Sequence, residues 1–283
     1  MRPMIRRLFA RRAMLPDEWA SDVLIALGDD GTIASVTPNA PPGNAERAAG
    51  PVIPGMPSLH SHAFQRAMAG LAERMGSRED SFWTWREVMY GFLDRLQPHD
   101  AHAVATQLYV EMLKHGYTSV AEFHYVHRDP EGKPYANKAE MACAHVHAAR
   151  EVGIAITMLP VLYAHSGFGA AALRVQQRRF ASTPADVLDV LRTVRDAHRE
   201  DPDVRVGIAP HSLRAVRPAA SRRASTRARR DRADRPGAHA CGRADARGRR
   251  LRRMERPTAR RMAARSCPGR CALVPRALHA HDG

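Results

Sequence analysis

Short apolar runs alternate with longer helix-like segments through residues 51–218. The short runs predict buried strands at 52–59, 118–123, 154–160 and 204–209. The longer segments predict helices at 63–75, 81–95, 98–115, 136–152 and 184–200. Strands that alternate with helices form parallel sheets through crossover connections, so we expect an α/β domain with four parallel strands.

A different pattern precedes this domain. Within residues 20–37, the apolar stretches DVLIAL and IASVT flank the turn sequence GDDGT. Asp-Gly between two strand-like runs is a hairpin signal. We therefore expect a small β-unit over residues 1–50, ahead of the α/β domain over residues 51–218.

Residues 219–283 differ in composition from everything before them. They contain 19 arginines, five acidic residues and no lysine, and so carry +14 of the chain's net charge of +15. They also lack Ile, Phe, Tyr, Trp, Asn and Gln. This composition leaves little material for a packed core and predicts a disordered tail. One explanation is an arm for nucleic acid, because clustered arginines neutralise phosphates.

Candidate chemistry lies at the end of the first strand-like run, in the sequence PVIPGMPSLHSH of residues 51–62. Residues two apart on a strand point to the same side, so His60 and His62 could hold one metal ion. Imidazole is a good ligand for zinc and iron. A bare His-x-His is more often a chance pair in a loop, so the neighbouring residues decide between these interpretations.

Four blocks carry a resemblance to a known family. They are PGMPSLHSHAFQRAMAGLAER from residue 54, SFWTWREVMY from residue 81, YTSVAEFHY from residue 117 and VGIAPHSLRAV from residue 206. The first resembles the signature of the amidohydrolase superfamily, in which a strand-end His-x-His opens the metal site of a (β/α)8 barrel. The four together resemble formimidoylglutamate deiminases, enzymes of histidine degradation, over roughly residues 5–216.

The resemblance implies a fold and a metal. The fold is the N-terminal part of an amidohydrolase-type (β/α)8 barrel, with the small β-unit over 1–50 and the first half of the barrel over 51–218. One divalent metal, zinc or iron(II), is implied, with His60 and His62 as ligands. A barrel active site is assembled from many strand ends. The family's third histidine ligand, its glutamate, a further histidine and its aspartate belong to the second half, so we assign no catalytic residue and expect the chain as written to be inactive.

The resemblance also implies a substrate. Metal-activated water would attack the formimino carbon of N-formimino-L-glutamate and yield N-formyl-L-glutamate and ammonia. Two carboxylates on this substrate need donors, above all arginine. The family's substrate contacts fall at Gln65, Arg86, Tyr125, His211 and Arg214. Each has a plainer alternative: solvated charges for the arginines, packing for the tyrosine and a helix-face amide for the glutamine. We do not expect His124, His127, His145, His147 and His165 to be ligands, because nothing in their spacing matches the motif.

A slipped reading frame is the second explanation for the tail. Permitted codons for residues 238–245, 250–256, 259–266 and 276–282, read one nucleotide later, encode HVAEQ, DCVAWS, PVEWLLD and VHSTHM. The family has HxHVAEQ, DDCVAWSG, RPVEWLLD and VHxTH in this order. We hypothesise a frameshift near residues 216–219. An intact single frame in the resequenced gene would refute it.

Three function classes remain open. The first is a formimidoylglutamate deiminase, and the second is a related amidohydrolase acting on a ring amine such as guanine or a triazine. The third and least favoured is a nucleic-acid-binding protein that uses the tail. No apolar run reaches the roughly 18 residues of a membrane span, and the basic start lacks a signal-peptide core, so we expect a cytoplasmic protein. The resemblance leaves open whether a homodimer forms.

Overall fold

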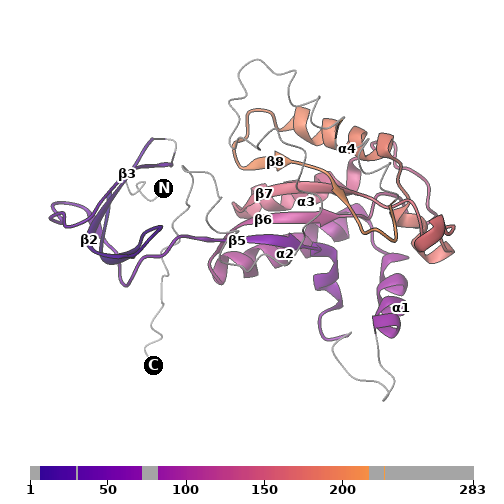
Figure 1. The fold of residues 1–283 in the computed structure, drawn as a ribbon, viewed down its shortest axis with the longest axis horizontal. Helices are drawn as coiled ribbons and strands as arrows, with labels where there is room; N and C mark the ends of the chain where they lie inside the picture. Colours follow the sequence, from indigo (N-terminus) through magenta and orange to yellow (C-terminus); the bar gives the residue numbers. More distant parts are fainter. Residues whose placement is uncertain (1–6, 30, 72–81, 217–225, 227–283) are drawn as a thin grey trace. The chain divides into compact units, whose positions relative to one another are not determined.

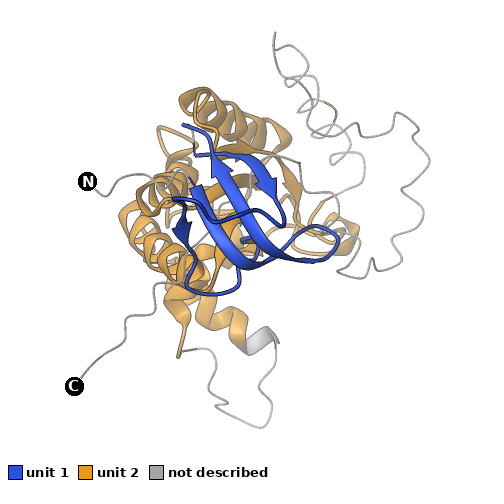
Figure 2. Ribbon diagram, turned by 90° about the vertical axis from the view of Figure 1, so that its left-hand side faces the viewer, with its two compact units in different colours: residues 1–55, 237–283 blue, residues 56–236 orange. Residues whose placement is uncertain are grey.

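The structure, a computed structural model, describes residues 7–29, 31–71, 82–216 and 226 (Figure 1). The chain divides into two compact units, one of residues 1–55 with 237–283 and one of residues 56–236 (Figure 2). The predicted disordered tail lies, apart from residue 226, outside the described residues. None of the described helices is both long enough and apolar enough to cross a membrane.

The small unit is a four-stranded sheet with the order β3-β2-β1-β4. The expected hairpin is confirmed, since β2 (Trp19–Leu27) and β3 (Ile33–Thr37) pair antiparallel. The sequence analysis did not assign β1 (Arg7–Met14), which pairs with β2 and with β4 (Glu46–Arg47). Three arginines interrupt the apolar alternation of β1. Its Leu8, Ala10 and Ala13 nevertheless form the unit's core together with Val23 and Ile25 of β2.

The larger unit contains the expected parallel sheet. Its strands run in the order β5 (Met56–Ser61), β6 (Tyr117–His124), β7 (Ala155–Leu162) and β8 (Val204–Val206), and β9 (Ala209–Pro210) pairs with β7. Its helices are α1 (Phe82–Leu93), α2 (Pro98–Lys114), α3 (Glu140–Val152) and α4 (Pro184–Ala197). Short 3-10 turns are η1 (Ala63–Met68), η2 (Phe168–Ala170) and η3 (Val175–Phe180). This strand and helix alternation confirms the predicted α/β class.

The first barrel strand starts later than predicted. Val52, expected at the start of strand 52–59, instead forms a parallel bridge with Ala13 in the small unit. Its N–H donates to the Arg12 carbonyl at 2.9 Å. Pro54 has no N–H to give to a ladder, so the backbone leaves one sheet here and enters the next at Met56.

Two further boundaries differ from the prediction. Within residues 63–71 of the helix expected at 63–75, the structure has only the 3-10 turn η1, and Gly70 adopts a φ of +81° shortly after it. Residues 72–75 lie outside the described residues. The fourth strand is split into β8 and β9 around Gly207. A Cβ at Gly207 would lie 2.8 Å from Cδ2 of Leu159, so a larger residue there would require the Leu159 side chain on β7 to shift.

Local signals fix the helix ends. Both α2 and α4 begin with a proline, whose missing N–H is not needed in the first turn. The Asp100 carboxylate accepts from the backbone N–H that precedes α2 at 2.9 Å, and Thr183 forms a capping box with Asp186 on α4. Gly153 ends α3 in the left-handed conformation.

Period-two alternation along β6 sorts its side chains between two faces. Val120, Glu122 and His124 are buried, and the last two contact Tyr109 of α2 and His145 of α3. Phe123, between them, lies against the rings of the His60 and His62 pair on the opposite face. The helix-facing layer is therefore a packed core, and the other face of β6 is available for a site.

Candidate active site

The two histidines of the HSH sequence point toward each other at the carboxyl end of β5. Their Nε2 atoms lie 3.0 Å apart. Nδ1 of His62 lies 3.0 Å from the carbonyl oxygen of Phe123 on β6. Because a carbonyl only accepts, Nδ1 carries the hydrogen and Nε2 keeps its lone pair. Burial lowers the pKa of His62 below the usual 6.5, which also favours the neutral ring that a metal needs.

This pair fits a divalent metal. Zinc binds imidazole nitrogens at about 2.0–2.1 Å, so two nitrogens 3.0 Å apart can reach one ion. Among the residues that the structure describes, no group of three His, Cys, Asp or Glu side chains is placed to hold a metal. His60 and His62 are thus the candidate metal ligands among the described residues.

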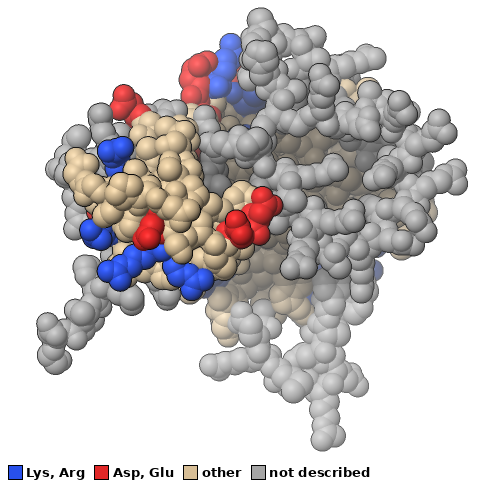
Figure 3. Space-filling view, turned by 60° about the vertical axis from the view of Figure 1, so that its left-hand side comes forward, with Lys and Arg blue, Asp and Glu red and all other residues tan. Residues whose placement is uncertain are grey.

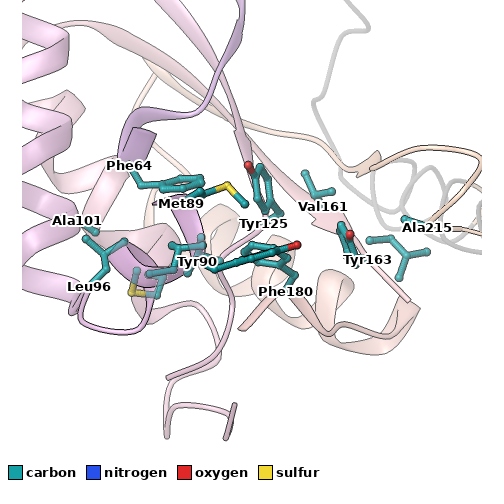
Figure 4. Packing of buried hydrophobic residues seen from close by; sticks show 14 of the residues in the cluster. Phe64, Met89, Tyr90, Leu96, Ala101, Tyr125, Val161, Tyr163, Phe180 and Ala215 are labelled. Atoms are coloured by element: carbon teal, nitrogen blue, oxygen red, sulfur yellow. The ribbon is translucent and has the colours of Figure 1, made fainter. Parts of the chain in front are cut away.

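Three of the five predicted substrate residues lie beside this pair. The ring of Tyr125, which follows β6, is 5.1 Å from that of His62, and the His211 ring is 5.6 Å from Tyr125. Gln65 Nε2 donates to the Tyr125 hydroxyl at 2.9 Å. Figure 4 shows Tyr125 in the cluster of buried aromatic residues that includes Phe180 and Tyr163. The carboxyl ends of β5, β6 and β9 therefore bring these residues together.

The two predicted arginines lie near the same histidine. His211 has its pKa lowered to about 4, first by burial and then by the positive charges of Arg214, His62 and Arg86. Arg86 is only 7% exposed, and its guanidinium donates to the Tyr90 hydroxyl, so it is not a solvated surface charge. Arg214 is half-buried.

The sequence analysis missed two residues of this region. Tyr163 directly follows β7, and its pKa is raised by burial while the charges of Arg86 and Arg214 lower it, which places it near both arginines. Glu122 is a buried carboxylate inside β6. A strand-end position could have indicated the tyrosine, and an acidic residue inside an apolar strand could have indicated the glutamate.

Among the described residues, the other histidines form no ligand set with the pair. His124, His127 and His145 are buried together, with ring centroids 5.3 Å apart for the first two and 4.9 Å for His124 and His145. His147 is exposed on α3. The prediction that these residues are not ligands is consistent with this placement.

The buried histidines predict acid-sensitive stability. Burial lowers the pKa of both His124 and His127 below the usual 6.5. Just below pH 6.5, these two histidines therefore bind protons in the unfolded chain but stay neutral in the folded one. Stability should be fully present above pH 6.5 and be lost as the pH falls below it, by up to about 1.4 kcal/mol per pH unit for each histidine. We expect the urea midpoint to drop from pH 7.5 to pH 5.5.

The substitution His124→Gln should flatten this pH dependence. His99→Gln is the matched control, because the His99 side chain is 81% exposed and lies outside the buried cluster. If the urea midpoint fell equally steeply with pH in both variants, the pH dependence would not come from the buried histidines.

Comparisons with known proteins agree with this geometry. Residues 52–240 match the model of the amidohydrolase family, and residues 5–50 match the N-terminal domain of the formimidoylglutamate deiminase HutF. The curated formimidoylglutamate deiminase of Pseudomonas aeruginosa is 51% identical over 211 residues. That alignment covers 75% of this chain and 46% of the relative, so the chain spans about half of the relative's length.

Solved structures show the same fold. An amidohydrolase from Brucella melitensis is 46% identical, with a TM-score of 0.75 over 80% of this chain and 50% of that one. The zinc complex of a mutant atrazine chlorohydrolase from Arthrobacter aurescens has a TM-score of 0.61 at 19% identity, over 79% of this chain and 51% of that one, which shows the fold alone. Since the family match covers more than half of the residues, this chain belongs to the amidohydrolase family.

Proposed function

We propose that this chain carries the N-terminal part of a metal-dependent deiminase that hydrolyses N-formimino-L-glutamate to N-formyl-L-glutamate and ammonia. The observation that carries the proposal is that the imidazole pair of His60 and His62 lies in one region with His211 and the charged groups of Arg86 and Arg214. The relative named formimidoylglutamate deiminase and the match to the HutF N-terminal domain support the same substrate.

Each residue has a role that follows from its contacts. His60 and His62 would hold the divalent metal, zinc or iron(II), which when bound supplies Lewis-acid activation of water. The Phe123 carbonyl keeps the His62 ring in the tautomer that presents Nε2. The Tyr125 hydroxyl accepts from Gln65, so its own hydrogen is free to donate to substrate.

The charged residues account for the substrate class. The guanidinium groups of Arg86 and Arg214 are suited to bidentate pairing with the two carboxylates. With its pKa near 4, His211 is neutral at physiological pH, so it can donate one hydrogen bond without adding a third charge. A ring amine offers no carboxylate for these guanidinium groups to bind, so it fits this set of residues less well than a dicarboxylate does.

The remaining proposals concern the organisation of the chain. We keep the boundaries 1–50, 51–218 and 219–283, a frameshift near residues 216–219 and a cytoplasmic location as parts of this proposal. Figure 3 shows basic and acidic side chains interspersed on the described part of the visible face. Reading the gene across codons 214–220 tests the frameshift directly.

A substrate comparison tests the function. The gene with its frame restored should yield a protein that releases ammonia from N-formimino-L-glutamate. It should act on N-formiminoglycine, which has a single carboxylate, with a kcat/KM at least about a hundredfold lower, because one of the two arginine–carboxylate contacts is then lost. Faster ammonia release from guanine or from an aminotriazine would overturn the proposal in favour of a ring-amine amidohydrolase.

A further inference from the structure

We propose that Glu122 is a positioning residue for the metal site: its carboxylate fixes the backbone that follows His62, so that the His62 ring is held toward His60. The inference rests on the proposed function only in taking His60 and His62 as metal ligands. Glu122 is not itself a ligand, because it lies on the helix-facing side of β6, where it contacts Tyr109 of α2.

Each oxygen of the Glu122 carboxylate accepts one hydrogen bond. Oε1 of Glu122 accepts from the backbone N–H of Ala63 at 2.7 Å, and Oε2 accepts from the Tyr109 hydroxyl at 3.2 Å. Glu122 is 1% exposed and Tyr109 is 0% exposed. A buried carboxylate is costly unless it is hydrogen-bonded, so its retention inside an apolar strand indicates that the bond to Ala63 has a specific role.

The Ala63 N–H is a group that needs a partner. Ala63 is the first residue of η1, where helical N–H groups have no partner within the turn, and no side chain of the turn caps it. The Glu122 carboxylate supplies a charge-assisted bond, which is shorter and stronger than a neutral one. Without it, the backbone between His62 and Ala63 would be free to rotate away from β6.

Neighbouring residues of β6 hold neighbouring residues of the site. Glu122 holds the backbone of Ala63, while the carbonyl of Phe123 holds the His62 ring through Nδ1 at 3.0 Å. Two fixed points, one on the main chain and one on the ring, determine both the position and the direction of the imidazole. The separation of 3.0 Å between the Nε2 atoms of His60 and His62 depends on this arrangement.

A second contact ties the other end of η1 to α2. Arg66 donates to both carboxylate oxygens of Glu111 at 2.7 and 2.8 Å, and these bonds come first among the causes that lower the Glu111 pKa to about 2. The Arg66 and Glu111 side chains are 37% and 32% exposed, so water screens this pair more than it screens the buried bond from Glu122.

The test measures zinc binding and the His62 tautomer in the full chain, without any substrate. Protein labelled with ¹⁵N-histidine is titrated with Zn²⁺, and the ring nitrogen shifts report both the tautomer of His62 and the apparent Kd. Glu122→Met removes the acceptor at similar volume, and Glu122→Asp withdraws the carboxylate by one methylene. Glu122→Gln keeps an oxygen for Ala63, and Tyr109→Phe removes only the second hydrogen bond.

We expect the Met and Asp variants to lose the single Nδ1–H tautomer of His62 and to bind zinc about tenfold more weakly. The Gln variant and Tyr109→Phe should stay close to the original protein. Unchanged zinc affinity in folded Glu122→Asp would overturn the proposal, and so would an equal loss in Glu122→Gln. Failure of the proposed deiminase reaction would leave these readouts untouched, so the two proposals are tested separately.

Discussion

Replacing His60 or His62 with alanine in the frame-restored protein is expected to lower kcat/KM for N-formimino-L-glutamate by at least about a thousandfold. Under the proposed function, each Nε2 would supply one bond to the bound ion, and the Phe123 carbonyl orients the ring of His62. Losing either ligand lowers the affinity for the metal ion. Without the ion, the site loses the activation of water, which contributes several kcal/mol to catalysis. Ammonia release and bound metal per chain are the two measurements.

His147→Ala is the matched control for this prediction. His147 is an exposed histidine on α3, and its ring lies 6.1 Å from that of His198, far from the residues of the site. It should retain both metal and activity. Full activity in His60→Ala with its metal still bound would show that the pair does not serve as the ligand set.

The barrel strands could be predicted from sequence because their apolar runs are short and bounded by turn residues. The strands β6 and β7 lie within two residues of the predicted ranges. The same reasoning failed at Val52, where an apolar β-branched residue belongs to the other sheet. Local pattern identifies a strand but carries no information on its partner, which is a property of the tertiary fold.

The candidate metal pair and the candidate substrate residues were predicted on a different basis. A resemblance carried by blocks of residues located Gln65, Arg86 and His211, and composition alone would not have done so. Glu122 escaped because its role depends on the N–H of Ala63, 59 residues away in sequence, which only the pairing of β5 with β6 brings close. Residues that act through backbone groups have no sequence motif of their own.

Residues without motifs also determine whether the site keeps its shape. Among them, Phe180 is expected to contribute most to the stability of the fold. Its ring packs 5.0 Å from Tyr125, 5.4 Å from Tyr163 and 6.2 Å from Tyr90, and it is 2% exposed. Phe180→Ala should destabilise the protein by about 3–5 kcal/mol through lost burial and the cavity left behind. Urea unfolding of the purified chain measures this change.

Phe168→Ala is the matched control, because it makes the same chemical change at an exposed position. Phe168 lies in η2 and is 77% exposed, so Phe168→Ala removes the same atoms from a side chain that is already in water. Its effect should stay within about 0.5 kcal/mol. Because Phe180 also supports Tyr125 and Tyr163, its alanine variant should raise KM in the frame-restored enzyme even where the protein stays folded. Equal stability losses at the two phenylalanines would mean that the aromatic cluster behind the site is not packed as the structure has it.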